Sequence, residues 1–489
     1  LEQNWFIDFI IYGEGEVTFN ELLKTIIDKK QDYSNINGLI YREDTKIIKT
    51  PPRPLIQDLD SIPSPYRDIG DDFKNKIVYF ESSRGCPFNC QFCLSSTIKG
   101  VRYFGLDRVK EDLGRLINAN VKQIKFVDRT FNANKKYAME IMKFIMDKDP
   151  KNMNFHFEVT AHLVDKEMLG FIKKAKEGLF QFEIGVQSTN SKTIEAIGRT
   201  TNFEKLKQVT ERIKSFNNIH QHLDLIAGLP YEEYSSFKKS FNDVYEIKPD
   251  KLQLGFLKLL KGSGLRDKKS EYGFKFLDVP PYEVLETDHI KYEEILRLKG
   301  IEDLVEKYYN EGYFKNSLDY IIKKRYNTPF DFFEDLLEYW EGKKYHTISH
   351  SRNSLYQILF DFYKERSFKD LNILNEVIKY DYIYNNKNPN IPRFLERTDV
   401  SFIQRNKHDI LKNENLLKDC LIKYKNKPTK QIINKIHIEA FEIDILKLIQ
   451  NNYRLEDERV NKTYILFDYK DGPIERSTTY NIDKYILEE

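Results

Sequence analysis

The chain has 489 residues, four of them cysteine, and its 78 basic and 76 acidic side chains leave a formal net charge of +2. This length fits roughly two to four domains, and so few cysteines exclude a small scaffold held together by disulfides. The balanced charge gives no reason to expect a polyanion as the main partner. The sequence has no run of about 18 apolar residues, which is the length that would indicate a membrane span.

Residues 1–29 predict a single βα unit. Residues 6–12 (FIDFIIY) have the composition of a buried strand, a GEGE turn follows at residues 13–16, and residues 18–29 have a helical pattern. This is the order of the last βα unit of a doubly wound, Rossmann-like domain. We expect the earlier strands of that domain to be missing before Leu1, although an ordinary strand–helix turn would also explain the GEGE sequence.

Residues 30–75 predict a linker. The sequence GLIYRED followed by KIIKT indicates a small hairpin with its turn near residues 44–46. Five of the 16 prolines follow in the segment PPRPLIQDLDSIPSPY. Because proline fixes φ and removes a hydrogen-bond donor, we expect this segment to cross the molecule in an extended conformation.

Residues 76–279 predict alternating strands and helices. The strands are expected at residues 77–82, 123–128, 154–159, 180–186, 222–227 and 251–257. The helices are expected at residues 106–119, 135–147, 166–175, 203–216 and 232–245. Such alternation is typical of parallel βα units, and six units indicate an incomplete barrel. We therefore expect an α/β fold with a partial (β/α)6 TIM-like barrel, whose active site lies at the C-terminal ends of the strands.

Residues 280–489 lack this alternation and predict a mostly α-helical C-terminal domain. Amphipathic patterns indicate helices at residues 353–365 and 439–450. Residues 460–468, followed by Gly472, indicate a terminal strand and turn.

Three of the four cysteines, Cys86, Cys90 and Cys93, fall within eight residues, directly after the first predicted barrel strand. Structural zinc commonly takes four ligands in two pairs, and the nearest histidine in sequence is His156. Three thiolates at this spacing favour a [4Fe–4S] cluster, which usually has four cysteine ligands. A cluster with three leaves one iron open for a small chelating molecule. Zinc or coincidence is the alternative.

The spacing CxxxCxxC, with Phe92 directly before the last cysteine, resembles the signature of radical S-adenosylmethionine (SAM) enzymes. The resemblance makes Phe92 a candidate for cofactor binding. The resemblance implies that the open iron binds the amino and carboxylate groups of SAM. It also implies that the reduced cluster passes an electron to the sulfonium, so that a 5′-deoxyadenosyl radical forms. Arg84 could offset the negative charge of the thiolates, or it could be an ordinary surface residue.

The ends of the predicted strands carry further candidates for SAM binding, as the resemblance implies. Asp128 in FVDRTFN is the candidate for the methionyl ammonium group, with a helix N-cap as its structural alternative. Glu183 and Gln187 in FEIGVQS share one face of a strand and are expected to contact the ribose and methionyl groups. In HLDLIAGLPYE, Asp224 is expected to point inward, and Gly228 builds the turn against which adenine packs.

The GEGE turn and the hairpin with its proline-rich connector resemble the cobalamin-dependent branch of this family. The resemblance implies cobalamin as a further cofactor, although the fingerprint DxHxxG is absent and its position would lie before Leu1. It also implies methyl transfer or a related C–H modification of an unknown small-molecule or peptide substrate. A flavodoxin or ferredoxin would supply the electron, and an oxygen-labile cluster implies a cytoplasmic protein. We expect no membrane or nucleic-acid partner.

Two other functions are left open by the sequence. A radical SAM tRNA methylthiotransferase would need a second set of cysteines, which Cys420 alone cannot supply. A non-catalytic iron–sulfur or zinc scaffold is the other alternative. Finally, His346 and His350 have the spacing of two metal ligands on a helix, but no third ligand is identifiable.

Overall fold

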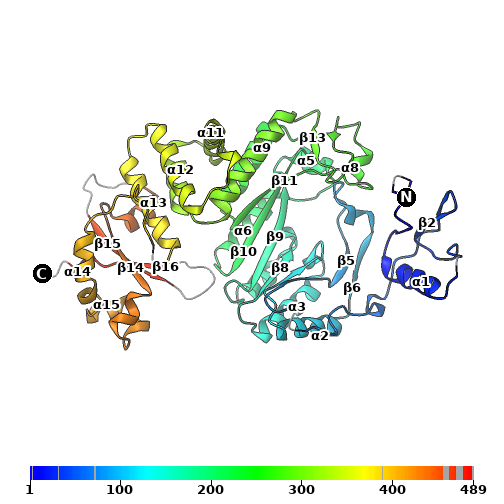
Figure 1. Cartoon of the computed structure of the whole chain (residues 1–489), viewed down its shortest axis with the longest axis horizontal. Coiled ribbons are helices and arrows are strands. Elements are labelled where there is room, and N and C mark those ends of the chain that lie inside the picture. The colour runs from blue at the N-terminus through cyan, green and yellow to red at the C-terminus, as the bar shows by residue number, and fades with distance from the viewer. Residues whose placement is uncertain are drawn as a thin grey trace. The chain divides into compact units, whose positions relative to one another are not determined.

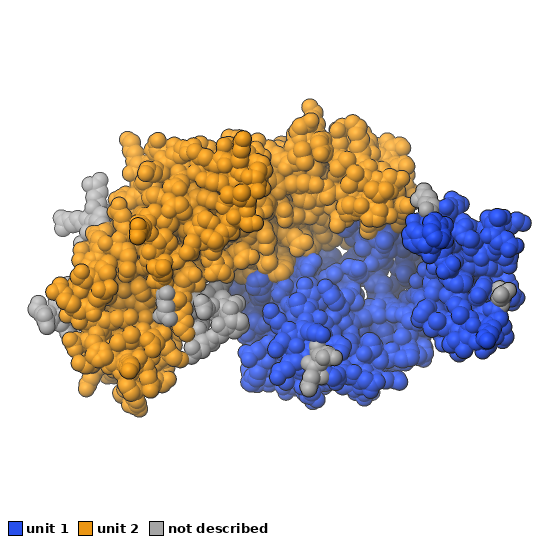
Figure 2. Space-filling view, in the orientation of Figure 1, with its two compact units in different colours: residues 1–184, 204–220 blue, residues 185–203, 221–489 orange. Residues whose placement is uncertain are grey.

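The computed structural model in Figure 1 describes residues 1–2, 4–30, 32–70, 73–387, 389–454, 462–469 and 477–486. The chain divides into two compact units (Figure 2), one of residues 1–184 and 204–220 and the other of residues 185–203 and 221–489. Within the described residues, no helix is both long and apolar enough to cross a membrane.

The predicted barrel strands form a six-stranded sheet in the order β11-β10-β9-β8-β7-β4. Strands β4, β7, β8 and β9 pair in parallel, and so do β10 and β11. Their bounds are Ile77–Phe80 for β4, Gln123–Phe126 for β7, Asn154–Glu158 for β8, Phe180–Gln187 for β9, Ile219–Ala227 for β10 and Lys251–Phe256 for β11. The predicted partial barrel is confirmed.

Helices follow the strands where the sequence predicts them. They are α2 (Leu106–Asn118), α3 (Lys135–Lys148), α4 (Lys166–Ile172), α6 (Phe203–Lys214) and α7 (Tyr234–Glu246), with the short α5 (Ser191–Ala196) in addition. Along β9 the apolar Phe180, Phe182 and Ile184 are fully buried, whereas Gln181 and Glu183 alternate with them and are half-buried. Because side chains alternate across a strand, one face of β9 is apolar and the other polar.

The N-terminal segment has a sheet of its own, in the order β1-β2-β3. Strand β1 (Phe9–Ile11) precedes helix α1 (Gly15–Ile27), and β2 (Leu39–Glu43) and β3 (Lys46–Lys49) form the predicted hairpin. The prediction of a buried strand over residues 6–12 is wrong in extent and burial. Strand β1 is an edge strand, antiparallel to β2 and half-buried, and Phe6 before it is 67% exposed.

The region after the barrel begins with short elements: α8 (Gly264–Asp267), β12 (Lys275–Phe276) and β13 (Val284–Glu286). The longer helices are α9 (Tyr292–Leu304), α10 (Lys315–Arg325), α11 (Pro329–Gly342), α12 (Arg352–Glu365), α13 (Leu371–Asn385) and α14 (Val400–Ile410). Short helices α15 (Glu414–Asp419), α16 (Thr429–Ile433) and α17 (Ile445–Gln450) follow. The predicted helical character of this region is confirmed.

The C-terminal region also contains an antiparallel sheet of β14 (Ile436–Phe441), β15 (Thr463–Tyr469) and β16 (Ser477–Asn481). The prediction of one helix over residues 439–450 is therefore wrong in its first part. All seven residues of the central strand β15 are buried, and pairing with it holds β14 extended despite the helical pattern of the sequence. Strand β15 lies within the predicted terminal strand, whereas Val460 and Gly472 lie outside the described residues.

Candidate active site

A hairpin in the first unit carries the cysteine loop. Strand β5 (Ser83–Cys86) pairs antiparallel with β6 (Gly100–Tyr103), and the loop between them contains a 3-10 turn at Leu94–Thr97. The Cys93 N–H donates to the Cys90 carbonyl at 3.0 Å, which tightens the loop. Cys86, Cys90 and Cys93 are half-buried and form no disulfide. The three cysteines are therefore partly accessible, and a disulfide occupies none of their sulfur atoms.

Gly85 is required by the base of this hairpin. Its φ is +100°, a conformation that L side chains rarely adopt. A Cβ at this position would also lie 2.2 Å from the carbonyl oxygen of Gly100, on the opposite strand. The close approach of the two backbones therefore fixes where Cys86, the next residue, enters the loop.

Arg84 is occupied by carboxylates. Its guanidinium contacts Glu81 at 3.0 Å and also pairs with Glu16, and its side chain is only 17% exposed. These contacts fit neither of the two roles expected for Arg84, a counter-charge to the thiolates or an ordinary surface residue. They connect the cysteine hairpin to the N-terminal GEGE turn.

Asp128, at the end of β7, is 1% exposed, and protein groups occupy its carboxylate. It accepts hydrogen bonds from the Ser82 N–H at 3.0 Å and the Ser82 hydroxyl at 2.6 Å, and also from the Ser83 hydroxyl. Burial raises its pKa to about 6, against the lowering effect of these bonds. Asp128 does not cap the following helix, because Asn134 occupies the N-cap of α3. Its predicted contact with the methionyl ammonium stays a prediction.

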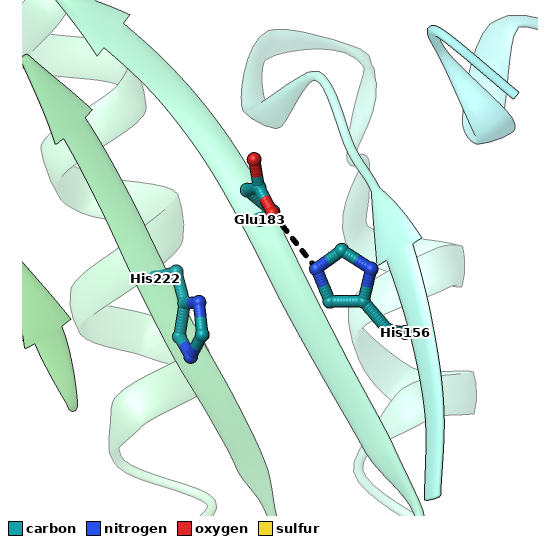
Figure 3. A group of neighbouring side chains, drawn as sticks. All are labelled: His156, Glu183 and His222. Carbon is teal, nitrogen blue, oxygen red and sulfur yellow. Dashed lines mark ion pairs between the residues drawn. The ribbon is translucent and has the colours of Figure 1, made fainter. Parts of the chain in front are cut away.

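Glu183 on β9 is paired with a histidine. Its carboxylate lies 2.9 Å from Nε2 of His156 on β8, and the Glu183 side chain is 32% exposed (Figure 3). Figure 3 also draws His222, which comes from β10. Because β8 and β9 are parallel neighbours, residues on their polar faces meet. The pair with His156 supplies the partner that a half-buried Glu183 needs.

Glu158, the last residue of β8, is a candidate that the sequence reasoning missed. It lies 3.5 Å from Arg129, and burial raises its pKa to about 7, although Arg129 opposes the shift. The alternation of NFHFEV could have revealed it, because His156 and Glu158 share one face of the strand. A carboxyl group that titrates near neutral pH at the end of a barrel strand is typical of a functional site.

In the second unit, Gln187 ends β9 in a left-handed conformation, with φ +71°. Its side chain is buried, and its Oε1 has no hydrogen-bond partner among the described residues. The next residue, Ser188, donates to Glu232, a fully buried carboxylate that also accepts from Ser236 at 2.9 Å and Ser240 at 3.2 Å. This network holds the turn that presents Gln187.

Asp224 and Gly228, also in the second unit, lie on β10 and in the turn after it. Asp224 is half-buried on the strand, and Gly228 has φ +86°, as a tight turn requires. Phe92, in the cysteine loop of the first unit, is half-buried. The SAM contacts expected for these three residues stay predictions.

The remaining candidates do not form a metal site of the expected kind. His346 lies in a 3-10 turn at Tyr345–Thr347, and His350 lies beyond it, so the two residues do not share one helix. The Nε2 atom of His350 is 2.9 Å from the Tyr345 carbonyl oxygen. The hypothesis of two ligands on a helix is wrong, because the helix it needs is not formed there.

The residues present fit two of the predicted cofactors, the [4Fe–4S] cluster and SAM. Three partly accessible thiols in one loop are a donor set suited to an iron–sulfur cluster. The buried Oε1 of Gln187, which lacks a partner among the described residues, is an acceptor suited to a ligand hydroxyl.

Comparison with known proteins agrees with this chemistry. Residues 80–244 match the Radical SAM superfamily, and residues 270–467 match a family described as a protein of unknown function (DUF4080). The uncharacterized methyltransferase PH0819 of Pyrococcus horikoshii is 34% identical over 46% of this chain and 50% of its own length. The cobalamin-dependent radical SAM methyltransferase TokK of Streptomyces tokunonensis is 26% identical over 56% of this chain and 43% of its own length.

Among solved structures, the cobalamin-dependent SAM radical enzyme OxsB is similar, with a TM-score of 0.48 and 16% identity over 76% of this chain and 63% of its own. The chain spans about half the length of the two curated relatives, at 50% and 43%. The match of residues 80–244 identifies a radical SAM domain within the chain, and the cofactors of such domains are a [4Fe–4S] cluster and SAM.

Proposed function

We propose that the chain is a cobalamin-dependent radical SAM enzyme that methylates, or otherwise modifies at a C–H bond, a small-molecule or peptide substrate. The observation that carries this proposal is the hairpin that presents Cys86, Cys90 and Cys93 beside a parallel sheet. The relative named as a cobalamin-dependent radical SAM methyltransferase supports the cobalamin and the methyl transfer.

When bound, the cluster and SAM supply reductive cleavage of a carbon–sulfur bond, which yields a radical able to abstract a hydrogen atom. The chain's own residues bind and orient the reactants. The three cysteines hold the cluster, Gln187 Oε1 accepts a hydrogen bond from a ligand hydroxyl, and Glu183 is held in place by His156. A small reductant such as a flavodoxin or ferredoxin delivers the electron in a reducing compartment.

Anaerobic reconstitution with iron and sulfide tests the proposal. We expect about four irons per chain and, after reduction in the presence of SAM, release of 5′-deoxyadenosine. Cys86→Ser should lose both. Cys420→Ser is the matched control, because Cys420 lies outside the loop, near the Tyr485 hydroxyl, and should retain both. Binding of zinc alone, or no release of 5′-deoxyadenosine from a fully loaded protein, would refute the proposal.

A further inference from the structure

Two arginines face each other across the cysteine hairpin. Arg84 on β5 lies directly opposite Arg102 on β6 in the strand register. Cys86 lies two residues further along β5, opposite Gly100. Like charges directly opposite each other destabilise an antiparallel pair. The hairpin that carries Cys86 therefore needs a negative group between the two guanidinium groups.

Glu14 of the GEGE turn supplies this group. Its Oε1 lies 2.6 Å from Nη2 of Arg102 and 3.5 Å from Nη1 of Arg84, and its Oε2 accepts from Nη1 of Arg102 at 3.0 Å. The Ile56 N–H donates to the same Oε2 at 2.7 Å. Burial disfavours ionisation of Glu14, but the bonds from Arg102 and Ile56 outweigh it and lower its pKa, so it is charged at neutral pH.

These contacts are shielded from water. The side chains of Glu14, Arg84 and Arg102 are 11%, 17% and 14% exposed. Removing one partner from a largely buried charge pair is costly, because the remaining charge is left uncompensated. With Glu16 and Glu81, which also pair with Arg84, the group contains three negative and two positive charges. Loss of the charge of Glu14 would therefore leave the neighbourhood of the cysteine loop more positive.

We propose that Glu14 is a positioning residue for the iron–sulfur cluster. It neutralises the facing arginines, fixes the base of the hairpin that presents Cys86, and sets the charge near the cluster. The GEGE turn is then part of the cluster site, although it lies 68 or more residues before the arginines it contacts. This inference rests on the proposed function, since it requires that the three cysteines bind a cluster.

The test is a redox titration of the reconstituted protein, followed by electron paramagnetic resonance. In Glu14→Gln we expect a midpoint potential more positive than that of the unmodified protein, because a negative charge near the cluster is lost. We also expect faster loss of iron. Glu21→Gln is the matched control, because it removes a carboxylate of helix α1 that pairs with Arg53, a residue outside the hairpin. The potential of the control should be unchanged.

A double variant guards against simple misfolding. In Glu14→Gln with Arg102→Gln, one of the two facing charges is removed, and Arg84 keeps Glu16 and Glu81 as partners. The repulsion across the hairpin is then gone, so iron retention should return toward that of the unmodified protein. If Glu14→Gln and Glu21→Gln have the same potential and iron retention, or if the double variant is worse than both single variants, the role of Glu14 is refuted. If the unmodified protein takes up no four-iron cluster, the proposed function fails, and this inference fails with it.

Discussion

Two neighbouring strands of the first unit, β7 and β8, each lead to a carboxylate, and the surroundings of the two differ. Asp128 after β7 is 1% exposed and accepts hydrogen bonds from Ser82 and Ser83. Glu158 at the end of β8 is 32% exposed, and its ion pair is with Arg129 at 3.5 Å. Burial raises the pKa of Asp128 to about 6 and that of Glu158 to about 7.

The difference separates a carboxylate whose oxygens are occupied by protein groups from one that keeps exposed surface. The oxygens of Asp128 are used inside the protein, where they connect the end of β7 to the segment between β4 and β5. Glu158 keeps exposed surface, and its partner Arg129 is itself 55% exposed. Position at a strand end therefore does not decide function. The hydrogen-bond partners that the fold supplies decide it.

Asp128→Ala tests whether the hydrogen bonds of Asp128 stabilise the fold, and it should cause the largest loss of stability. The Ser82 N–H and two serine hydroxyls would lose their acceptor inside the protein. We expect a loss of about 2–4 kcal/mol in the free energy of unfolding, measured by urea denaturation. Glu140→Ala, within α3, removes a carboxylate from a partly exposed pair with Lys110 at 3.0 Å, and should cost less than about 1 kcal/mol. Equal losses in the two variants would contradict the structural role.

Much of the fold could be predicted because its signals are local. Alternation along residues 180–186 and the helical period of residues 135–147 each lie within one element, and both elements form there. The spacing of Cys86, Cys90 and Cys93 is local too. The prediction for residues 439–450 failed because β14 depends on pairing with β15, more than 20 residues later in the chain.

The site could be predicted only in part, for the same reason. The sequence singled out Asp128 by its position, but its hydrogen bonds come from Ser82 and Ser83, at separations of 46 and 45 residues. Glu232 likewise contacts Ser188 across 44 residues. No local pattern shows that the first carboxylate is satisfied or that the second supports the turn at Gln187.

Glu158→Gln tests the second carboxylate of the comparison, through the pH dependence of the free energy of unfolding. The pKa of Glu158 is raised from 4.5 to about 7 on folding. Between these values the native state binds the proton more tightly, so this group's contribution to stability is lost as the pH rises toward 7. We expect the unfolding free energy of the variant to fall less over this range than that of the unmodified protein. Urea denaturation at a series of pH values measures it.

Glu177→Gln is the control for this series, because Glu177 is exposed. Its stability should follow that of the unmodified protein at each pH. If Glu158→Gln also follows the unmodified curve, Glu158 does not carry the raised pKa. A decrease at every pH would instead show that Glu158, like Asp128, is structural, and the comparison between the two carboxylates would fail.

Arg129→Gln should have the smallest effect on stability. The direction in which it shifts the pKa of Glu158 tests whether Arg129 acts on this carboxyl group. Arg129 favours the ionised form of Glu158, so its removal should raise the pKa of Glu158 further. An exposed ion pair contributes about 0.2–1 kcal/mol, which corresponds to less than about 1 in pKa. Two differences in unfolding free energy are measured against pH. One is between the unmodified protein and Glu158→Gln, and the other is between Arg129→Gln and the double variant Arg129→Gln with Glu158→Gln. The midpoint of the second difference should lie at a higher pH than that of the first. An unchanged midpoint would mean that solvent screens this pair completely, so that burial and the other charged neighbours, such as Glu183, set the pKa of Glu158.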